Sequence, residues 1–477
     1  MWSTFTPDDT RCRALSNWRL AAAAGLLLSA CAVPDADQSI ARATNAAPNA
    51  APQIEGAQGP LSAEESRHLI AQLAGPAAGD ILQHHLVVEQ AVAGTPLTAD
   101  NAVAVLRDGG ATFDAIAAAI LGARRNINLE YYTIEDVTLD SAGKLSDLLV
   151  HKLGEGVAVN LIYDSYGSSD TPAAFFDRLK KAGAKLVDFH PVDPTPAHAL
   201  AINDRDHRKI FVADGTIAII GGVNLSKSYE SKSPGSKNGT PTANGLPQQW
   251  RDTSVRISGP AVKEIQTLFF DHWQAEGGPK LDLAGYFPQL EATGSQVVRV
   301  IGSTPKADMS RYYVTLISAL RSAEKRVWIQ AAYFVPTPQE VDALVHAARR
   351  GVDVRLMVPA ASDSSEAIAA GQSHYSELMD AGVKIYETRN VVLHSKTVVI
   401  DGVWSAVGSS NFDHRSVLFN DEIDAIILGS DAASALESIF EDGVKTANAI
   451  DRDQWEEHRP FGERVHGFFS RLWEGVL

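Results

Sequence analysis

Apolar residues along this chain recur first at helical and then at strand spacing, and this order occurs twice. The first copy comprises the ranges 113–125, 127–132, 145–153 and 157–163, and the second comprises 312–325, 327–330, 341–350 and 352–358. The similar phrases Ala182-Gly183-Ala184-Lys185-Leu186 and Ala381-Gly382-Val383-Lys384-Ile385 then open a third strand in each half. Alternating helices and strands predict an α/β fold of two similar domains related by pseudo-twofold symmetry, with mixed, mostly parallel sheets flanked by helices.

The distance between the two copies indicates duplication of a whole domain. Matching landmarks are separated by 187 to 200 residues, which is far longer than the repeat of a solenoid. We therefore predict an N-terminal domain over residues 61–285 and a C-terminal domain over residues 286–477. Residues 31–60 are rich in Ala, Pro and Asn without hydrophobic periodicity, as is typical of a flexible tether.

The first thirty residues have the pattern of a targeting segment. Arg11, Arg13 and Arg19 precede an apolar run, Leu20 to Leu28, that is shorter than the ~20 residues needed to span a bilayer. The following Cys31 completes a Leu-Ser-Ala-Cys tetrad that resembles a bacterial lipobox. We predict a lipoprotein signal peptide over 1–30 and a lipid anchor on Cys31 that holds the protein in the bacterial cell envelope, facing the periplasm. The alternative is an ordinary cleaved signal with an incidental cysteine, and the choice between inner and outer membrane stays open.

Composition limits the partners of the protein. The chain has 42 Lys and Arg against 58 Asp and Glu, a net charge of −16, so no overall positive field attracts nucleic acid. An anionic ligand must therefore be held by local groups. The chain has two cysteines, Cys12 and Cys31, and loss of Cys12 with the signal would leave a mature protein without a disulfide.

One constellation of polar residues occurs in both halves. In each, His is followed by Lys two residues later, Asp seven later and Asn seventeen later: His207, Lys209, Asp214 and Asn224, and His394, Lys396, Asp401 and Asn411. On a strand, side chains two residues apart share a face, so each His and Lys pair should converge on one side. Small residues precede each Asn and let the backbone approach a ligand closely.

Two imidazoles, two ammonium groups and two amides suit a phosphodiester substrate. Lys and Asn side chains can hold the nonbridging oxygens and stabilise the charge that develops in the transition state. One His can attack phosphorus while the other protonates the leaving oxygen. An alcohol or water would then open the covalent phosphohistidine. This chemistry needs no metal and no other cofactor, because the lysines supply the positive charge.

The doubled His-x-Lys-x4-Asp motif resembles that of the phospholipase D superfamily. Sequence around it, from about Thr95 onwards, resembles the bacterial cardiolipin synthase branch of that superfamily. The phrases that carry the resemblance are Asn128 to Tyr132, Asp206 to Lys209, Gly221 to Asn224, Trp250 to Asp252, Tyr333 to Pro336, Gly351 to Pro359, and His394 to Glu422. The resemblance implies two phospholipase D-like domains with one site between them.

The resemblance also implies roles for individual residues. His207 would be the nucleophile and His394 the general acid and base, although the near symmetry of the site allows the reverse. The phosphate-binding positions correspond to Lys209, Lys396, Asn224, Asn411 and, in the turn before Asn411, Ser409. Asp252 and Glu422 would each orient an imidazole, whereas Asp214 and Asp401, at strand ends just before a Gly, are predicted to be structural.

We predict a phosphatidyltransferase that makes cardiolipin from phosphatidylglycerol. A hydrolase that releases phosphatidic acid would use the same residues and stays open as an alternative. It is a serious one, because typical bacterial cardiolipin synthases begin with two membrane-spanning helices, in place of a lipoprotein signal. A nuclease and a noncatalytic lipid-binding lipoprotein are further alternatives. Both motifs lie in one chain, so a monomer suffices for the site, and the oligomeric state stays open.

Overall fold

The computed structural model describes residues 33–46, 52–74, 80–82, 84–139, 142–191, 203–230, 249–305 and 310–458. The predicted signal peptide and Cys31 lie outside these residues, so the anchor stays a prediction. Among the helices within the described ranges, none is both long enough and apolar enough to cross a bilayer.

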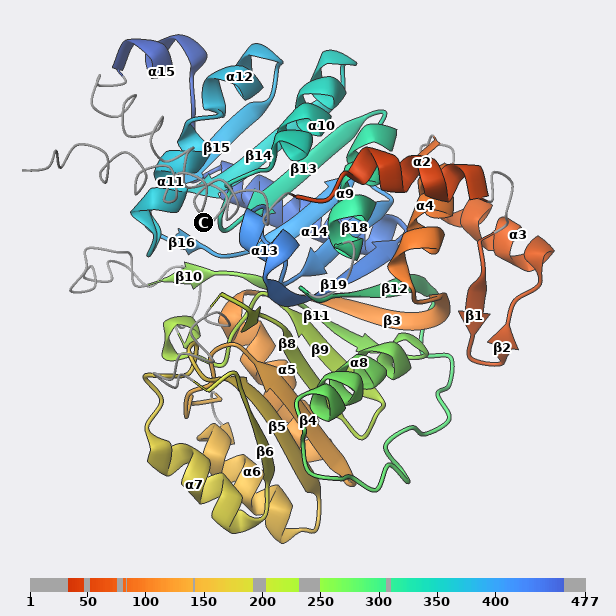
Figure 1. Ribbon diagram of the computed structural model, residues 1–477, viewed down its shortest axis with the longest axis vertical. Coiled ribbons are helices and arrows are strands. Elements are labelled where there is room, and N and C mark those ends of the chain that lie inside the picture. The colour runs from red at the N-terminus through yellow and green to blue at the C-terminus, as the bar shows by residue number, and fades with distance from the viewer. Residues whose placement is uncertain are drawn as a thin grey trace, which may run out of the picture. The chain divides into compact units, whose positions relative to one another are not determined.

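The N-terminal half places helices and strands in the predicted alternation (Figure 1). Its helices are α5 (Asp108–Gly122), α6 (Leu145–Gly154), α7 (Ala173–Ala182) and α8 (Ala261–Ala275). Its strands are β3 (Leu97–Arg107), β4 (Asn126–Tyr131), β5 (Ala158–Asp164), β6 (Lys185–Phe189), β7 (Arg205–Asp206), β8 (Lys209–Ala213), β9 (Ile217–Gly221), β10 (Trp250–Arg251) and β11 (Thr253–Ser258). A 3-10 turn, η4 (Lys227–Tyr229), follows β9.

The C-terminal half repeats this order. Its helices are α9 (Arg311–Ser322), α10 (Pro338–Arg349), α11 (Ser365–Gln372), α12 (Tyr375–Asp380), α13 (His414–Leu418), α14 (Ser430–Val444) and α15 (Arg452–His458). Its strands are β12 (Gln296–Ser303), β13 (Arg326–Ala331), β14 (Asp353–Pro359), β15 (Lys384–Thr388), β16 (Val392–Leu393), β17 (Lys396–Ile400), β18 (Trp404–Gly408), β19 (Asn420–Leu428) and β20 (Asn448–Ala449). Matching elements in matching order confirm the predicted mixed α/β fold.

The pairing of the strands is more antiparallel than predicted. Parallel pairing joins the strands that are connected through helices, β4 with β5 and β6, and β13 with β14 and β15. The motif strands instead run antiparallel: β8 lies between β4 and β9, and β17 lies between β13 and β18. The physical reason is that each motif strand turns back through a short hairpin, which allows only antiparallel pairing. In these hairpins Asp214 and Gly215, and Asp401 and Gly402, have positive φ angles of 53° to 70°, which Asp and Gly tolerate.

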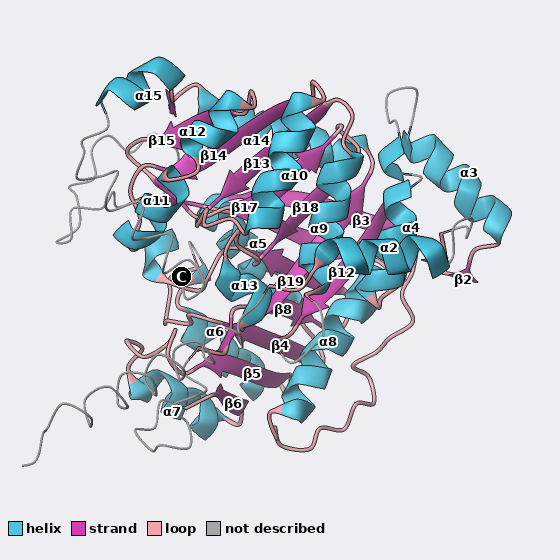
Figure 2. Ribbon diagram, turned by 45° about the horizontal axis from the view of Figure 1, so that its top comes forward, coloured by secondary structure: helices cyan, strands magenta, loops and turns pink. Residues whose placement is uncertain are grey.

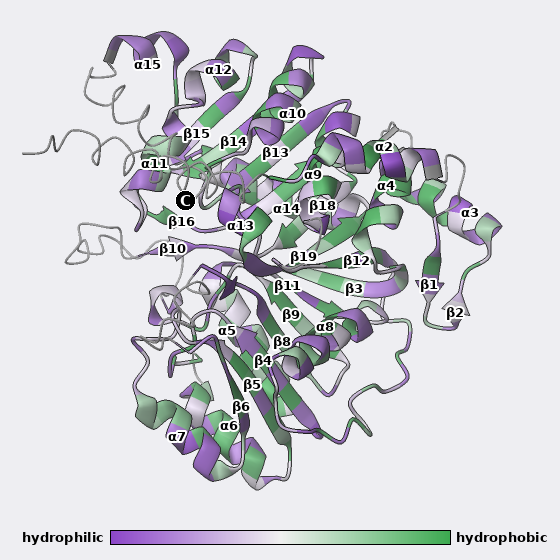
Figure 3. Ribbon diagram, in the orientation of Figure 1, coloured by the Kyte–Doolittle hydropathy of each residue, from purple (hydrophilic) through white to green (hydrophobic). Residues whose placement is uncertain are grey.

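The apolar faces of the two half-sheets pack against each other. A single buried cluster combines Ile210, Ile220 and Val255 of the N-terminal half with Val300 and Ile423 of the C-terminal half. Hydrophobic colouring follows these strands through the middle of the molecule in Figure 3. Strand β3 joins the two sheets, since it pairs with β11 along one part and with β12 along another. Helices lie outside the strands, as Figure 2 shows. This packing brings the two motif segments to one place.

Several further helices and strands precede β3. Helix α2 (Ala36–Ala46) contacts α4 (His84–Ala93) and α9, and strand β1 (Ile54–Gly56) pairs with β2 (Gly59–Pro60) and β3. Helix α3 (Ala63–Ala74) and the 3-10 turn η2 (Asp80–Leu82) lie between β2 and α4. The range 31–60 was predicted to be a flexible tether. Its described parts instead form regular structure, because Ala36, Ala43 and Ile54 bury their side chains against the fold.

Candidate active site

Each motif histidine follows a short strand that pairs with the opposite half of the molecule. Strand β7, which precedes His207, pairs in parallel with the start of β19, and the His207 backbone N–H donates to the Asp421 carbonyl at 2.9 Å. Strand β16, which precedes His394, pairs in parallel with β10, and the His394 N–H donates to the Arg251 carbonyl at 2.7 Å. In each half, a parallel strand pair and a backbone hydrogen bond from the opposite half thus fix the position of the motif histidine.

The carboxylates are exchanged between the halves in the same way. Nδ1 of His207 lies 3.1 Å from both carboxylate oxygens of Glu422, which belongs to the C-terminal half. Nδ1 of His394 lies 2.7 Å from Oδ2 of Asp252, which belongs to the N-terminal half. A carboxylate at Nδ1 fixes the ring orientation and stabilises an imidazolium. In His207 this leaves Nε2 as the nitrogen for chemistry at the substrate, whereas Nε2 of His394 also lies 3.1 Å from Nζ of Lys396.

The two carboxylates differ in ionisation. Burial favours a neutral Glu422, but the charges of His207 and Lys209 and hydrogen bonds outweigh it, so the pKa of Glu422 is lowered. Burial raises the pKa of Asp252 to about 6, against the opposing effect of Lys396 and the Thr253 backbone N–H. His207 therefore faces a firmly ionised partner, whereas the partner of His394 titrates close to neutrality.

Both imidazoles favour the neutral form. Burial lowers the pKa of His207, and Glu422 opposes this shift. Burial, together with the ammonium groups of Lys396 and Lys209, lowers the pKa of His394 well below its ordinary value. An anionic ligand placed between the lysines would offset their charge and raise the pKa of His394, because an opposite charge favours the protonated ring.

Each motif lysine contacts the backbone of the histidine that lies two residues before it. Nζ of Lys209 donates to the His207 carbonyl and Nζ of Lys396 donates to the His394 carbonyl, both at 2.6 Å. Burial lowers the pKa of Lys209 to about 7 and the pKa of Lys396 to about 8, against the opposing charges of Glu422 and Asp252 respectively. A bound anion would favour the protonated, positively charged form of both lysines, because an opposite charge stabilises the ammonium group.

Both halves line a cavity of about 430 Å³, and Lys209, Lys396, Asp252 and Glu422 are not among its lining residues. His207, His394, Asn224 and Asn411 all face it, so the structure brings the two His and two Asn of the motifs together. The Asn224 side-chain oxygen accepts a hydrogen bond from the Thr133 backbone N–H at 3.2 Å, which fixes the amide. The cavity is about the size of a small-molecule site.

The lining of the cavity also contains charged residues that the sequence did not single out. Two arginines, Arg205 and Arg415, and two acids, Asp363 and Asp413, contribute to its wall. Arg205 forms an ion pair with the buried Asp164 at 3.3 Å. Arg205 and Arg415 lie close in the chain to His207 and Asn411 respectively, and their positive charges can attract an anionic headgroup.

Asp214 and Asp401 lie at the far ends of the motif strands, away from the cavity lining. Asp214 accepts hydrogen bonds of 2.7 to 3.0 Å from the backbone N–H groups of Arg124, Arg125 and Asn126. Asp401 accepts bonds of 2.8 to 3.0 Å from the corresponding N–H groups of residues 324 to 326. Each carboxylate thereby anchors the start of a neighbouring strand, which supports the predicted structural role.

Ser409 differs from its prediction as a substrate-binding residue. Its side chain is fully buried and does not line the cavity. Its hydroxyl donates to Oε2 of Glu422 at 2.5 Å and accepts from the Ile423 backbone N–H at 3.0 Å. The reason is that Gly408 and Ser409 pack against β19, so this hydroxyl points towards the carboxylate behind His207.

Other contacts of the carboxylates were not predicted from the sequence. The Tyr229 hydroxyl lies 2.8 Å from Nδ1 of His394 and donates to Oδ2 of Asp252 at 3.1 Å. The Ser416 hydroxyl donates to Oε1 of Glu422 at 2.7 Å. Both residues follow their motif Asn by five positions, 224 to 229 and 411 to 416. That shared spacing was the available signal.

A family model and the curated proteins agree on the relatives of this chain. A family model described as "Cardiolipin synthase, PLD-like domain" matches residues 116–233 and 316–443. The cardiolipin synthase of Geobacillus kaustophilus (strain HTA426) is 34% identical over 385 residues, 80% of this chain and 74% of that protein. The cardiolipin synthase of Listeria monocytogenes serotype 4a (strain HCC23) is 35% identical over 356 residues, 74% of this chain and 71% of that protein.

A solved structure shares the fold. The phosphatidylserine synthase of Haemophilus influenzae Rd KW20 superposes with a TM-score of 0.57 over 82% of this chain and 99% of that chain, at 13% sequence identity. At this identity the likeness concerns the arrangement of helices and strands. The duplicated α/β architecture is therefore shared with a protein of known structure.

Proposed function

Because this chain belongs to the phospholipase D superfamily, as a cardiolipin synthase-like enzyme, we propose that it transfers a phosphatidyl group between phosphatidylglycerol molecules through a covalent phosphohistidine. The observation that carries the proposal is the exchange of carboxylates between the halves, Glu422 at His207 and Asp252 at His394, around one cavity. Two oriented imidazoles at one cavity are the minimum for a two-step displacement at phosphorus.

In the first step, Nε2 of His207 attacks the phosphorus of phosphatidylglycerol. The bond between phosphorus and the oxygen of the glycerol headgroup breaks, and His394 donates a proton to that oxygen, so glycerol leaves. Glu422 stabilises the positive charge that forms on the His207 ring, which its lowered pKa allows. Lys209, Lys396, Asn224 and Asn411 stabilise the nonbridging oxygens.

In the second step, a hydroxyl of another phosphatidylglycerol replaces glycerol in the site. His394, now neutral, takes the proton of that hydroxyl, the oxygen attacks phosphorus, and the bond to His207 breaks. The products are cardiolipin and the free enzyme. Assignment of His207 as the nucleophile rests on Glu422, which is ionised near neutral pH, whereas Asp252 has a pKa of about 6.

A product assay tests the proposal. Purified protein is incubated with phosphatidylglycerol vesicles, and the lipids are identified by mass spectrometry. We expect cardiolipin and one glycerol per cardiolipin formed, and no product from the His207→Ala, His394→Ala double variant. Phosphatidic acid without cardiolipin would identify a hydrolase. Cleavage of DNA with intact phospholipid would identify a nuclease, and full activity of the double variant would place the reaction elsewhere.

Attachment to a membrane is a separate proposal that rests on the sequence. The Leu-Ser-Ala-Cys tetrad places Cys31 at the lipidation position of a lipoprotein. In a bacterial host, we expect the protein in the membrane fraction and a Cys31→Ser variant released from it or left with its signal uncleaved. Equal fractionation and processing of both proteins would contradict the anchor.

A further inference from the structure

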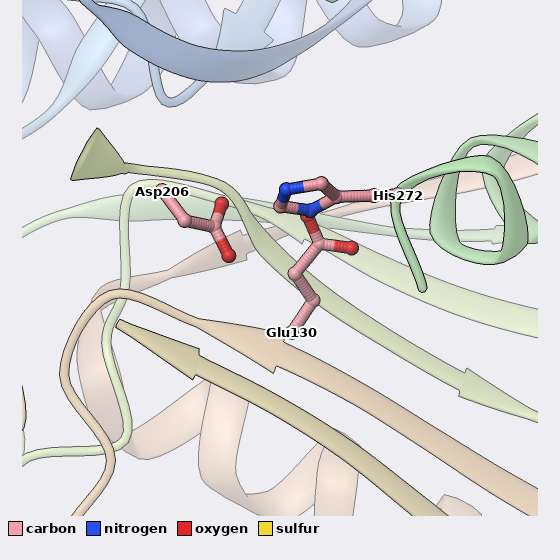
Figure 4. Close-up of side chains that lie close together, drawn as sticks. All are labelled: Glu130, Asp206 and His272. Carbon is pink, nitrogen blue, oxygen red and sulfur yellow. The ribbon is translucent and has the colours of Figure 1, made fainter. Parts of the chain in front are cut away.

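A buried ionic cluster lies directly behind the segment that carries His207. It consists of Glu130 from β4, Asp206 from β7 and His272 from α8, with Arg208 and Asp421 beside it. The ligand-bearing atoms of Glu130, Asp206 and His272 all lie within 4.8 Å of one another, and Figure 4 shows the three side chains converging. Asp206 and Arg208 flank His207 in the chain, and neither of these two flanking residues takes part in the proposed reaction.

Each of the three converging residues uses one polar atom within the protein and leaves its other one without a partner. Nδ1 of His272 lies 2.8 Å from Oε1 of Glu130, and one oxygen of Asp206 accepts from the Arg208 backbone N–H at 3.2 Å. In contrast, Nε2 of His272, Oε2 of Glu130 and Oδ2 of Asp206 are buried without a hydrogen-bond partner. Three residues of one cluster that each bury a polar atom without a partner are unusual, because buried polar atoms in native proteins nearly always have partners.

The charges of the cluster point to a cation. Three buried carboxylates, Glu130, Asp206 and Asp421, face the one guanidinium of Arg208, which lies 3.3 Å from Glu130 and 3.0 Å from Asp421. A divalent cation bound among these carboxyl groups would be stabilised by their negative charge, since buried carboxylates are normally paired or coordinate metals. Two carboxylate oxygens and one imidazole nitrogen are a donor set that Zn²⁺ and Mn²⁺ accept.

A second buried network in the same protein provides a comparison. His85, Glu89 and Arg299 also combine an imidazole, a carboxylate and a guanidinium, and all three are buried. There both ring nitrogens of His85 have partners, Ser318 and Glu89, and both oxygens of Glu89 are bonded. The imidazole and the carboxylate are therefore fully bonded there, although Nη2 of Arg299 has no partner, whereas around His272 both the imidazole and the carboxylates have unpartnered atoms.

The C-terminal half shows that the fold does not require these charges behind a motif histidine. The residue of β13 that corresponds to Glu130 is Gln330, which donates to Thr397 at 3.1 Å. Leu393 and Ser395 flank His394 where Asp206 and Arg208 flank His207. Neutral residues therefore occupy these positions in the C-terminal half. The fold does not need charged residues there, so we infer that the charged residues of the N-terminal half have a separate function.

We propose that Glu130, Asp206 and His272 bind one divalent metal ion, Zn²⁺ in preference to Mg²⁺ or Ca²⁺, as a structural site. The ion links β4, β7 and α8 and thereby holds the segment on which His207 lies. It does not contact the substrate, because Asp206 and His207 are adjacent in an extended segment and point to opposite faces. A neighbouring cavity of about 280 Å³, lined by His272 and Asp271 among others, gives a route for the ion from solvent.

A titration tests the site independently of enzyme activity. The full chain is freed of metal with a chelator and titrated with Zn²⁺, and bound metal is measured by equilibrium dialysis. We expect one tightly bound ion per chain and a higher Tm with Zn²⁺ than without it, because a ligand that binds only the folded state stabilises it. Wild-type protein that binds no Zn²⁺, or binds Mg²⁺ equally well, would overturn the proposal.

Matched variants locate the ion. His272→Gln should weaken Zn²⁺ binding by about 100-fold or more and abolish the rise in Tm, since one ligand is lost. His85→Gln, in the second network, should retain both, because both ring nitrogens of His85 already have partners within the protein. If His272→Gln does not fold, Asp206→Asn replaces it, because it removes the charge at constant size. Far-UV circular dichroism of the metal-free proteins shows that each variant is folded.

The motif histidines provide an essential control, because two imidazoles can themselves bind Zn²⁺. The His207→Ala, His394→Ala double variant should keep its tightly bound ion, and X-ray absorption of this variant should show one imidazole nitrogen among oxygen ligands. Loss of the ion in the double variant would place it in the active site. A zinc spectrum without imidazole would also contradict the proposed ligands.

Discussion

The two motif histidines occupy matching places in duplicated halves, yet their surroundings differ. His207 faces Glu422, whose lowered pKa keeps it ionised, and that carboxylate also accepts bonds from Ser409 and Ser416. His394 faces Asp252, with a pKa of about 6 and a hydroxyl, Tyr229, that contacts both groups. Under the proposed mechanism this difference gives the two halves separate roles: the firmly ionised carboxylate suits the nitrogen that becomes cationic, and the carboxyl group with the higher pKa suits the ring that exchanges protons.

The strongest test of this difference removes each imidazole in turn. His207→Ala should lower kcat by about 10⁴-fold or more, because the nucleophile is lost, and His394→Ala by about 10²- to 10⁴-fold, because proton transfer is lost. A phosphatidyl ester of p-nitrophenol separates the roles, since its leaving group needs no proton. His394→Ala should still release one equivalent of p-nitrophenol in a burst, and His207→Ala should release none. The reverse pattern would exchange the two assignments.

A smaller effect is expected when each carboxylate becomes an amide. Glu422→Gln should reduce kcat by about 10²- to 10³-fold and Asp252→Asn by about 10-fold, because Glu422 stabilises the cationic ring of the proposed phosphohistidine whereas Asp252 partners a ring that exchanges a proton. Steady-state rates of cardiolipin formation measure both. As a control, both variants should retain the Tm of the wild type within a few degrees. Equal losses in the two variants would mean that the halves are functionally equivalent.

The pH dependence of kcat/KM should show the same difference. Activity should fall below about pH 6 as Asp252, with its pKa of about 6, takes up a proton. Activity should also fall above about pH 7 to 8 as Lys209 and Lys396, with pKa values of about 7 and 8, lose theirs. In Asp252→Asn the acidic limb should move to lower pH while the alkaline limb stays in place. An unchanged acidic limb would show that another group controls it.

The smallest effect on catalysis should come from the structural aspartates, where the halves are alike. Asp214→Asn and Asp401→Asn should each lower the free energy of unfolding by about 1–3 kcal/mol, because an amide oxygen replaces a carboxylate that accepts three backbone N–H bonds. Denaturant unfolding measures this loss. Activity measured well below the melting temperature should be near that of the wild type. A large loss of kcat in either variant without loss of stability would give that aspartate a role in the reaction.

Much of the fold and site followed from local patterns in the chain. Helical and strand periodicity predicted the alternation in both halves, and equal spacing predicted that His207, His394, Asn224 and Asn411 meet at one cavity. The direction of the motif strands was not predicted, because a short hairpin and a helical crossover are equally compatible with an apolar run of five residues such as β8 or β17. The role of Ser409 was missed for a related reason, since its partner Glu422 lies on a strand paired beside it.

The sequence by itself determined which residue types meet in the candidate site and predicted their chemistry. Residue types and their spacing within a strand decide which side chains share a face, and their duplication decides that there are two such faces. Only the tertiary structure decided which carboxylate serves which imidazole, because that depends on β7 pairing with β19 and β10 pairing with β16 across the two halves. It also placed Glu130, Asp206 and His272 together, from positions as much as 142 residues apart. Contacts between residues so far apart in the chain depend on how the two half-sheets pack, and a local sequence pattern does not predict that packing.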